Sequence, residues 1–275
     1  MEHDNTILAA LQLNASDDWQ SNRREIELLV DAAVDQGAGM LVLPENLSYM
    51  PRDMTDLLEV AEDESGPVYA FLSRLARRHR VWLVGGTVPY RSAGTVGKIR
   101  ARTPVFNPQG QLVASYDKMH LFDVTLPDRN ESYLESSVFE PGSQPLVFDA
   151  GFAKVGVAVC YDLRFPELFR QLVEQGATII VVPAAFTAQT GRAHWQPLLR
   201  ARAIENQCYV VASAQVGFHP NGRETWGHSM VIDPWGTVLS DAGDNQPGLA
   251  IAQYDNEWLQ ELRRRFPVLV HRRLH

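Results

Sequence analysis

Residues 154–167 read Lys-Val-Gly-Val-Ala-Val-Cys-Tyr-Asp-Leu-Arg-Phe-Pro-Glu, and this stretch decides the fold. Its first half is an apolar run typical of a buried strand, and after Pro166 apolar side chains recur at helical spacing. Cys160 therefore lies near a strand-to-helix turn, where backbone N–H groups are expected to lower the pKa of a thiol and to hold a developing oxyanion. A free cysteine is more often a small buried hydrophobe, and that packing role is expected for Cys208, which enters a run of β-forming residues.

The alternation of short β-rich runs and helical patterns extends over the whole chain. Further strands are expected at residues 6–12, 40–43, 81–87, 103–106, 112–116, 146–149, 178–182, 209–214, 230–232, 238–239 and 249–254. Helices are expected at residues 22–36 and from a cap at Ser65 to Arg80. This order predicts an α/β fold.

Turn signals and loops complete this picture. The segments 107–110 (Asn-Pro-Gln-Gly) and 233–236 (Asp-Pro-Trp-Gly) predict hairpins. The polar segment from Asp123 to Gln144 has no sustained periodicity and is expected to be a long ordered loop over the site, in the position of a lid. No linker, low-complexity tract or repeat interrupts the chain, so residues 1–275 are expected to form one domain.

Composition excludes several classes of protein. With 45% hydrophobic and 21% charged residues the chain is expected to be a soluble globular protein. Its net charge of -8 argues against a nucleic-acid-binding role, because a phosphate backbone calls for a clustered cationic face. Two cysteines give no disulfide framework, and no signal peptide or apolar stretch of roughly 20 residues is present, so a cytoplasmic protein without a membrane span is expected.

Three chemically distinct residues each follow a predicted strand: Glu45, Lys118 and Cys160. Strand ends deliver loops to a common rim, where a carboxylate, an ammonium and a thiol could converge. Taken singly, Glu45 and Lys118 would more often be ordinary surface charges. Their shared context makes them candidate catalytic residues.

The segments around these residues resemble the nitrilase superfamily of carbon–nitrogen hydrolases. They are residues 43–45 (Leu-Pro-Glu), 116–123 (Tyr-Asp-Lys-Met-His-Leu-Phe-Asp) and 159–167 (Val-Cys-Tyr-Asp-Leu-Arg-Phe-Pro-Glu). The resemblance covers nearly the whole chain. It implies a four-layer α-β-β-α sandwich that pairs into an eight-layer dimer, with no metal or organic cofactor.

The resemblance also implies a mechanism. Cys160 would attack an amide carbon, Glu45 would serve as general base, and Lys118 would stabilise the oxyanion, so that an acid and ammonia are released through a thioester. A second glutamate is expected in the loop after Lys118, and Glu135 is the better match, with Glu131 as the alternative.

Tyr161 and the residues that follow it are similar to the Nit-type amidases within this superfamily. Four further segments strengthen that placement and look closest to deaminated glutathione amidases: residues 191–195, 200–207, 226–230 and 266–268 with 271–273. The alternatives are an ω-amidase acting on α-keto acid amides such as α-ketoglutaramate, and a hydrolase of N-carbamoyl compounds. A binding or assembly module with a vestigial site is a non-enzymatic alternative, which the intact Glu45, Lys118 and Cys160 disfavour.

The same resemblance implies the substrate-binding residues Tyr161, Arg164, Phe186 and Thr190. Arg164 offers paired donors to a substrate carboxylate, although a salt bridge with Glu167 is an alternative. Phe186 would form an apolar wall or simply a part of the core. The chain departs from the branch pattern at Arg192 and Gln196, which could alter substrate preference or be solvent-facing drift.

Overall fold

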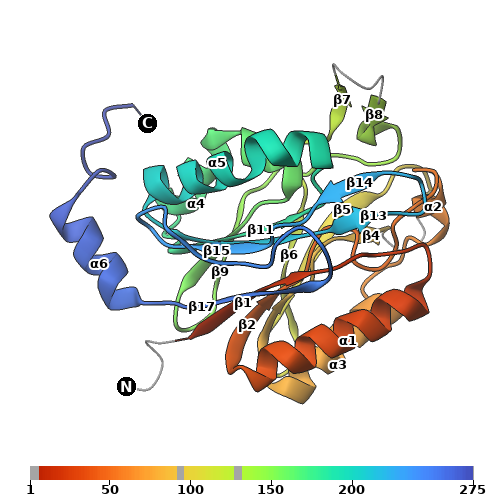
Figure 1. Ribbon diagram of the computed structural model, residues 1–275, viewed down its shortest axis with the longest axis horizontal. Helices are drawn as coiled ribbons and strands as arrows, with labels where there is room; N and C mark the ends of the chain where they lie inside the picture. The colour runs from red at the N-terminus through yellow and green to blue at the C-terminus, as the bar shows by residue number, and fades with distance from the viewer. Residues whose placement is uncertain (1–5, 92–95, 127–131, 275) are drawn as a thin grey trace.

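Four layers, α-β-β-α, make up the computed structural model, which describes residues 6–91, 96–126 and 132–274 (Figure 1). Helices α1 (Trp19–Asp35) and α3 (Pro67–His79) cover the outer face of one sheet. Helices α4 (Pro166–Glu174) and α5 (Ala188–Asn206) cover the other sheet, and the two sheets pack face to face through β1 and β12. The expected four-layer sandwich is confirmed.

The first sheet has seven strands. Their order is β17 (Gly248–Gln253), β1 (Ile7–Gln12), β2 (Ala38–Val42), β3 (Trp82–Val84), β5 (Arg100–Phe106) and β4 (Val88–Tyr90), with β6 (Leu112–Asp117) also paired to β5. Strands β1, β2 and β3 are parallel, whereas β5 and β6 form the antiparallel hairpin expected across Asn107 to Gly110.

The second sheet has six strands. Their order is β16 (Val238–Asp241), β15 (Met230–Ile232), β12 (Tyr209–Ala214), β11 (Ile179–Ala184), β10 (Lys154–Val157) and β9 (Leu146–Asp149). Strands β10, β11 and β12 are parallel, and the outer pairs are antiparallel. The parallel strands of both sheets therefore send the loops that follow them to defined edges.

The core depends on the two-residue period of the strands. In β1 and β2, Leu8, Ala10, Met40 and Val42 belong to the cluster between the sheets, and Ala9, Leu11 and Leu41 to the cluster beneath α1 and α3. Successive side chains of a strand point to opposite faces, so a sheet that is covered on both sides needs continuous apolar runs. These runs are the sequence signal that predicted the strands.

The segment expected to be a long loop contains more regular structure than its sequence suggests. Strands β7 (Asp123–Thr125) and β8 (Ser132–Leu134) pair antiparallel, and a 3₁₀ turn, η1 (Glu135–Ser137), follows. A second small ladder joins β13 (Val216–Phe218) to β14 (Glu224–Trp226). Strands β7, β8, β13 and β14 are short and contain polar residues or glycine among their apolar ones, unlike the equally short but fully buried β15, so neither ladder was predicted.

The helices also depart from the sequence expectations in detail. Ser65 does not cap α3, because Gly66 precedes the helix and the Glu62 carboxylate accepts from the N–H groups of Val68 and Tyr69. Helix α5 was not expected, and it contains Pro197 in its interior. Two further helices, α2 (Asp56–Glu59) and α6 (Asn256–Arg265), lie outside the four layers. Of the helices in the described part of the chain, none has the length and apolar character needed to cross a bilayer.

Gly86 fixes the turn that carries Glu45. Its φ is +55°, and a Cβ there would lie 2.0 Å from the carbonyl oxygen of Pro44. Glycine avoids both the steric overlap and the cost of the left-handed conformation. The position of the Glu45 backbone thus depends on the absence of a side chain at residue 86.

We predict that Gly86→Ala lowers the free energy of unfolding by about 2–4 kcal/mol, because overpacking adds to the cost of the positive φ. Gly151→Ala is the matched control. Gly151 has a φ of +82°, but a Cβ there would have no atom within 4 Å apart from those of residues 150–152, so this variant should lose only about 1–2 kcal/mol. Urea denaturation of the three proteins measures the difference. Equal losses in the two variants would refute the steric argument.

Candidate active site

Cys160 occupies a strained turn at the end of a central strand. It follows β10 and begins a 3₁₀ turn, η2 (Cys160–Arg164), which leads into α4. Its φ is 47°, which an L-residue seldom adopts and which costs about 1–3 kcal/mol. Such outliers persist only where the surroundings hold them, and here the turn places Cys160 at the wall of a pocket. The predicted strand-to-helix turn is present.

Asp162 holds this turn in place. Its buried carboxylate accepts from the Val159 N–H at 2.8 Å, the Tyr116 hydroxyl at 2.8 Å and the His120 N–H at 2.9 Å. These bonds tie the residues before Cys160 to those that flank Lys118. The sequence motif around Cys160 contains Asp162 but predicts no role for it, because no spacing rule indicates that this carboxylate also binds two donors more than 40 positions away.

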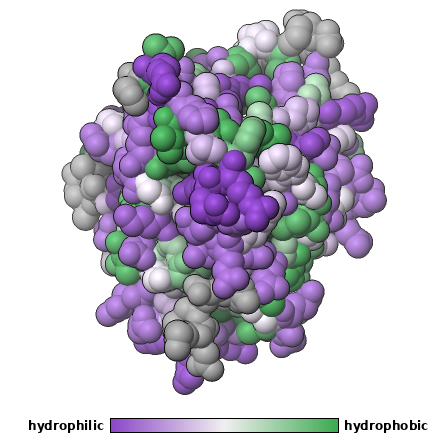
Figure 2. Space-filling model, turned by 90° about the vertical axis from the view of Figure 1, so that its left-hand side faces the viewer, coloured by the Kyte–Doolittle hydropathy of each residue, from purple (hydrophilic) through white to green (hydrophobic). Residues whose placement is uncertain are grey.

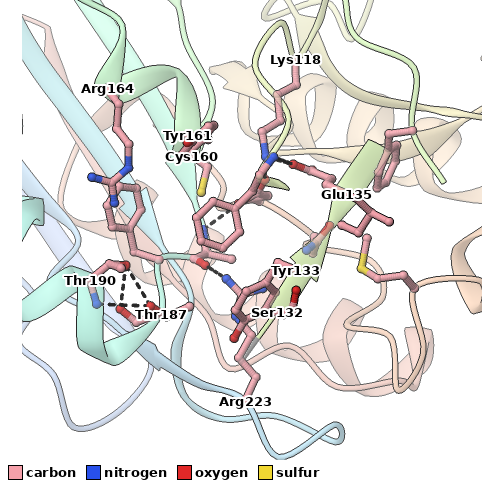
Figure 3. Close-up of a pocket in the computed structure, with 18 residues that line it drawn as sticks. Lys118, Ser132, Tyr133, Glu135, Cys160, Tyr161, Arg164, Thr187, Thr190 and Arg223 are labelled. Carbon is pink, nitrogen blue, oxygen red and sulfur yellow. Dashed lines mark hydrogen bonds and ion pairs between the residues drawn. The ribbon is translucent and has the colours of Figure 1, made fainter. Parts of the chain in front are cut away.

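Lys118 lies between two buried carboxylates from other segments (Figure 3). Its Nζ is 2.8 Å from Oε1 of Glu45 and 2.9 Å from both carboxylate oxygens of Glu135. Glu45 follows β2, Lys118 follows β6, and Glu135 begins η1. The structure therefore places Glu135 beside Lys118, while Glu131 lies outside the described residues.

Glu45 is held from all sides. Besides the bond to Lys118, its Oε2 accepts from the Ala185 N–H at 2.8 Å. Its backbone carbonyl accepts from the Gln215 side chain at 2.8 Å, and its carboxylate lies near enough to the Cys160 thiol to raise the pKa of that thiol. A base that is fixed in this way needs no reorganisation before it takes a proton.

Burial and neighbouring charges shift the pKa values of Glu45, Glu135 and Lys118 in different directions. Burial is the largest single effect on the pKa of Glu45 and raises it, but the combined effects of Lys118, the Cys160 thiol and Arg223 lower it overall. For Glu135, burial and the neighbouring Glu45 prevail over Lys118, so its pKa is raised. Burial disfavours the charged form of Lys118, yet the two carboxylates raise its pKa well above the usual range. The arrangement favours an ionised Glu45 beside a charged Lys118.

The expectation of a lowered thiol pKa at Cys160 is wrong. Burial and the adjacent Glu45 carboxylate raise the pKa of the thiol, and the opposing effects of Lys118 and the Ala185 N–H are smaller. Desolvation and a like charge both disfavour a thiolate. The free site therefore holds a protonated cysteine in contact with a carboxylate that can accept its proton.

Cys208 fits the packing role expected of it. It is buried, and its Sγ contacts the backbone carbonyl oxygens of Ala177 and Asn206. Arg263 from α6 reaches Sγ at 3.3 Å, but burial dominates and raises the thiol pKa to about 11. No carboxylate base contacts this thiol in the described part of the chain.

The expected substrate-binding residues share the pocket with Cys160. Tyr161, Arg164, Phe186 and Thr190 all line it. The Arg164 guanidinium lies 5.3 Å from the Phe186 ring centre and 3.2 Å from Nδ1 of His194, in place of the salt bridge with Glu167 that was the alternative. The Thr190 hydroxyl is 2.8 Å from that of Thr187.

Two residues singled out in the sequence lie outside the pocket, and two residues that line the pocket were not predicted. Arg192 and Gln196 are exposed on α5 and do not line the pocket, and Arg192 lies over the Trp226 ring. Arg223 and Tyr133 do line it, although neither was predicted from the sequence. Tyr133 belongs to β8, and Arg223 lies in the turn between β13 and β14. Within the described ranges, no group of three or more His, Cys, Asp or Glu side chains could hold a metal ion.

Comparison with known proteins identifies the family. The carbon–nitrogen hydrolase model matches residues 7–264. A deaminated glutathione amidase from Synechocystis is 45% identical over 268 residues, which is 97% of each chain. Among solved structures, the NitFhit protein of C. elegans has a TM-score of 0.92 at 33% identity, over 99% of this chain and 66% of that one. Nit3 of Saccharomyces cerevisiae, a member of branch 10 of the nitrilase superfamily, has a TM-score of 0.88 at 30% identity, over 98% and 97%.

The order of the motifs, the four-layer fold and the length of these matches agree, and the protein belongs to the carbon–nitrogen hydrolase family of the nitrilase superfamily.

Proposed function

We propose that this protein is a cysteine-dependent amidase of deaminated glutathione, with Cys160 as nucleophile, Glu45 as general base and Lys118 as oxyanion donor. The observation that carries the proposal is the Lys118 ammonium held between Glu45 and Glu135, beside the Cys160 thiol. The curated relative from Synechocystis supports the choice of substrate. Glu135 acts as a positioning residue, because it fixes Lys118 by two hydrogen bonds.

The geometry supplies each proton transfer. Glu45 takes the thiol proton as Sγ attacks the amide carbon, and the oxyanion receives hydrogen bonds from Lys118 and the N–H of Tyr161. Glu45 then gives that proton to the leaving nitrogen, and the C–N bond breaks to leave a thioester on Cys160. In the second half, Glu45 removes a proton from water as the hydroxide attacks the thioester. The thiolate leaves and regains its proton from Glu45, which restores the free site.

The nature of the leaving group depends on the amide. A primary amide such as α-ketoglutaramate releases ammonia, whereas deaminated glutathione, an oxo acid joined through an amide to cysteinylglycine, releases an amine at the same step. Arg164 binds the oxo-acid carboxylate by its paired donors, with Tyr161 and Phe186 as apolar walls and Thr190 as a hydroxyl partner. Hydrolysis of α-ketoglutaramate is the second candidate function, since it uses the same acyl-side residues.

We also propose a homodimer of single-domain protomers in the cytoplasm. The face that carries α6 and the C-terminal segment shows apolar patches around a strongly hydrophilic centre (Figure 2). Exposed apolar side chains on the segments of this region include Trp235 at 57%, Phe266 at 54% and Val270 at 78%. The rings of Trp235 and Phe266 are in contact, and a cluster of this kind is typical of a surface that a second protein covers.

The substrate series tests the function directly. We expect kcat/KM to be highest for deaminated glutathione, lower for α-ketoglutaramate and lowest for an N-carbamoyl amino acid. A neutral ester of the oxo-acid carboxylate should lower kcat/KM by about 10- to 100-fold, because one or two charge-assisted hydrogen bonds to Arg164 are lost. Preference for the N-carbamoyl compound would overturn the proposed substrate.

The two cysteines should differ sharply. Cys160→Ala is expected to abolish hydrolysis while the fold is retained, whereas Cys208→Ala should keep most of the activity, because Glu45 contacts only the Cys160 thiol. Steady-state rates and mass spectrometry of acyl adducts check this, with circular dichroism to verify the fold. Comparable turnover by Cys160→Ala would contradict the covalent mechanism.

The pH profile should depend on Glu135. A raised pKa means that Glu135 takes up a proton at a higher pH than an ordinary carboxyl, so activity should fall as the pH drops through that range. In Glu135→Gln, Glu45 alone shares the Lys118 charge, so the acid limb of kcat/KM should move to lower pH while kcat drops by about 10²-fold through loss of positioning. Glu140→Gln, a more exposed carboxylate near Arg100, is the control and should leave the profile unchanged. An acid limb that stays in place in Glu135→Gln would refute the assignment.

A further inference from the structure

Arg223 is a cation of the pocket that the mechanism does not use. It lies between β13 and β14 and lines the same cavity as Cys160. Figure 3 shows Arg164 entering the pocket from the upper left and Arg223 from below, with Cys160 in the upper part of the view. The two arginines therefore offer the cavity two separate sites for an anionic group.

The guanidinium of Arg223 has N–H donors that its contacts within the protein do not use. Its Nη2 donates to the backbone carbonyl oxygen of Ala185, and its Cζ lies 5.2 Å from the centre of the Tyr133 ring. Its Nε is buried without a hydrogen-bond partner, and no carboxylate forms an ion pair with it in the described part of the chain. A buried N–H group without a partner costs free energy unless a ligand or water satisfies it.

The hairpin that carries Arg223 is held rigidly. The Arg223 carbonyl oxygen accepts from the His219 N–H at 2.9 Å. The His219 ring lies between the Ala15 carbonyl oxygen at 2.9 Å and the Thr225 hydroxyl at 2.7 Å. Burial lowers the pKa of His219 to about 4, so the ring is neutral near pH 7. No charge on this buried ring then disturbs its two hydrogen bonds. A guanidinium on such a support is already positioned for a ligand.

Glu45 and Arg223 both form hydrogen bonds with the backbone of Ala185. The Ala185 N–H donates to Oε2 of Glu45, and the carbonyl oxygen of the same residue accepts from Arg223. Arg164 instead contacts His194 and the rings of Tyr161 and Phe186. In the proposed reaction Glu45 gives a proton to the leaving nitrogen, so the leaving group must lie near Glu45 and hence near Arg223.

We propose that Arg223 binds a carboxylate on the leaving group, so that the pocket selects amides with an acid group on both sides of the scissile bond. This rests on the proposed amidase function and deepens it. Deaminated glutathione has a carboxylate at each end, whereas α-ketoglutaramate has none on its leaving side. Arg223 is then the residue that separates the two candidate substrates.

The test compares deaminated glutathione with its glycinamide analogue, in which only the carboxylate of the leaving group is neutralised. Wild-type protein should favour the acid in kcat/KM by about 10- to 100-fold, the effect of one or two charge-assisted hydrogen bonds. Arg223→Met should reduce this ratio nearly to one, and Arg223→Lys should retain only part of it, since an ammonium lacks the planar fork.

Arg164→Met is the matched control. It removes a guanidinium from the same pocket and should lower kcat/KM for both compounds while it preserves their ratio. The ratio also cancels any general effect of Arg223 on the charge of Glu45. An unchanged ratio in both Arg223 variants would overturn the assignment.

A binding measurement separates this inference from the proposed function. Isothermal titration of the two compounds into Cys160→Ala, and into the same variant with Arg223→Met, measures carboxylate recognition without turnover. If wild-type protein hydrolyses neither compound, the proposed function fails, and preferential binding of the acid that depends on Arg223 still supports the inference. Equal binding of acid and amide, or no measurable binding of the acid to Cys160→Ala, would overturn it.

Discussion

The ammonium of Lys118, shared by two buried carboxylates, is the interaction on which the site depends. Glu45, Lys118 and Glu135 come from three segments that are separated by up to 90 positions in the chain, and each charge would be costly to bury without the others. The loops after β2 and β6 and the turn η1 must therefore meet at one point. The place where these segments meet lies beside the end of β10, where Cys160 is located.

A second constraint follows from this cluster of charges. The same carboxylate that can deprotonate Cys160 also raises the pKa of its thiol, so the free protein keeps the nucleophile protonated. A protonated thiol is the weaker nucleophile and is less easily oxidised. In the proposed mechanism the reaction requires a substrate whose developing oxyanion is stabilised by Lys118 at the moment Glu45 takes the proton. A protein can activate a cysteine by lowering the thiol pKa permanently or by placing a general base beside a protonated thiol. This site has the second arrangement.

Much of the fold could be predicted from the sequence because it rests on long apolar runs. Strands β9, β12 and β15 have the bounds that were expected, and the strand ends before Glu45, Lys118 and Cys160 lie within two residues of the expected positions. The ladders β7–β8 and β13–β14 were not predicted because their short strands lack the apolar run of the equally short β15 and their pairing depends on tertiary contacts. Asp162 and Arg223 were missed for the same reason: their importance lies in which distant groups they face.

The pocket has cations that can attract anions, although the molecule as a whole is negatively charged. A net charge of -8 repels a dianion at long range, although salt screens that repulsion beyond about 8 Å at physiological ionic strength. Inside the pocket the positive charge of Lys118 is balanced by Glu45 and Glu135, so Lys118 cannot also hold a substrate carboxylate. Of the cations that line the pocket in the described ranges, Arg164 and Arg223 remain to attract the carboxylates of a substrate. Under the proposed function, recognition of acidic amides comes from short-range pairing with these two guanidinium groups, because the net charge of the molecule does not attract an anion.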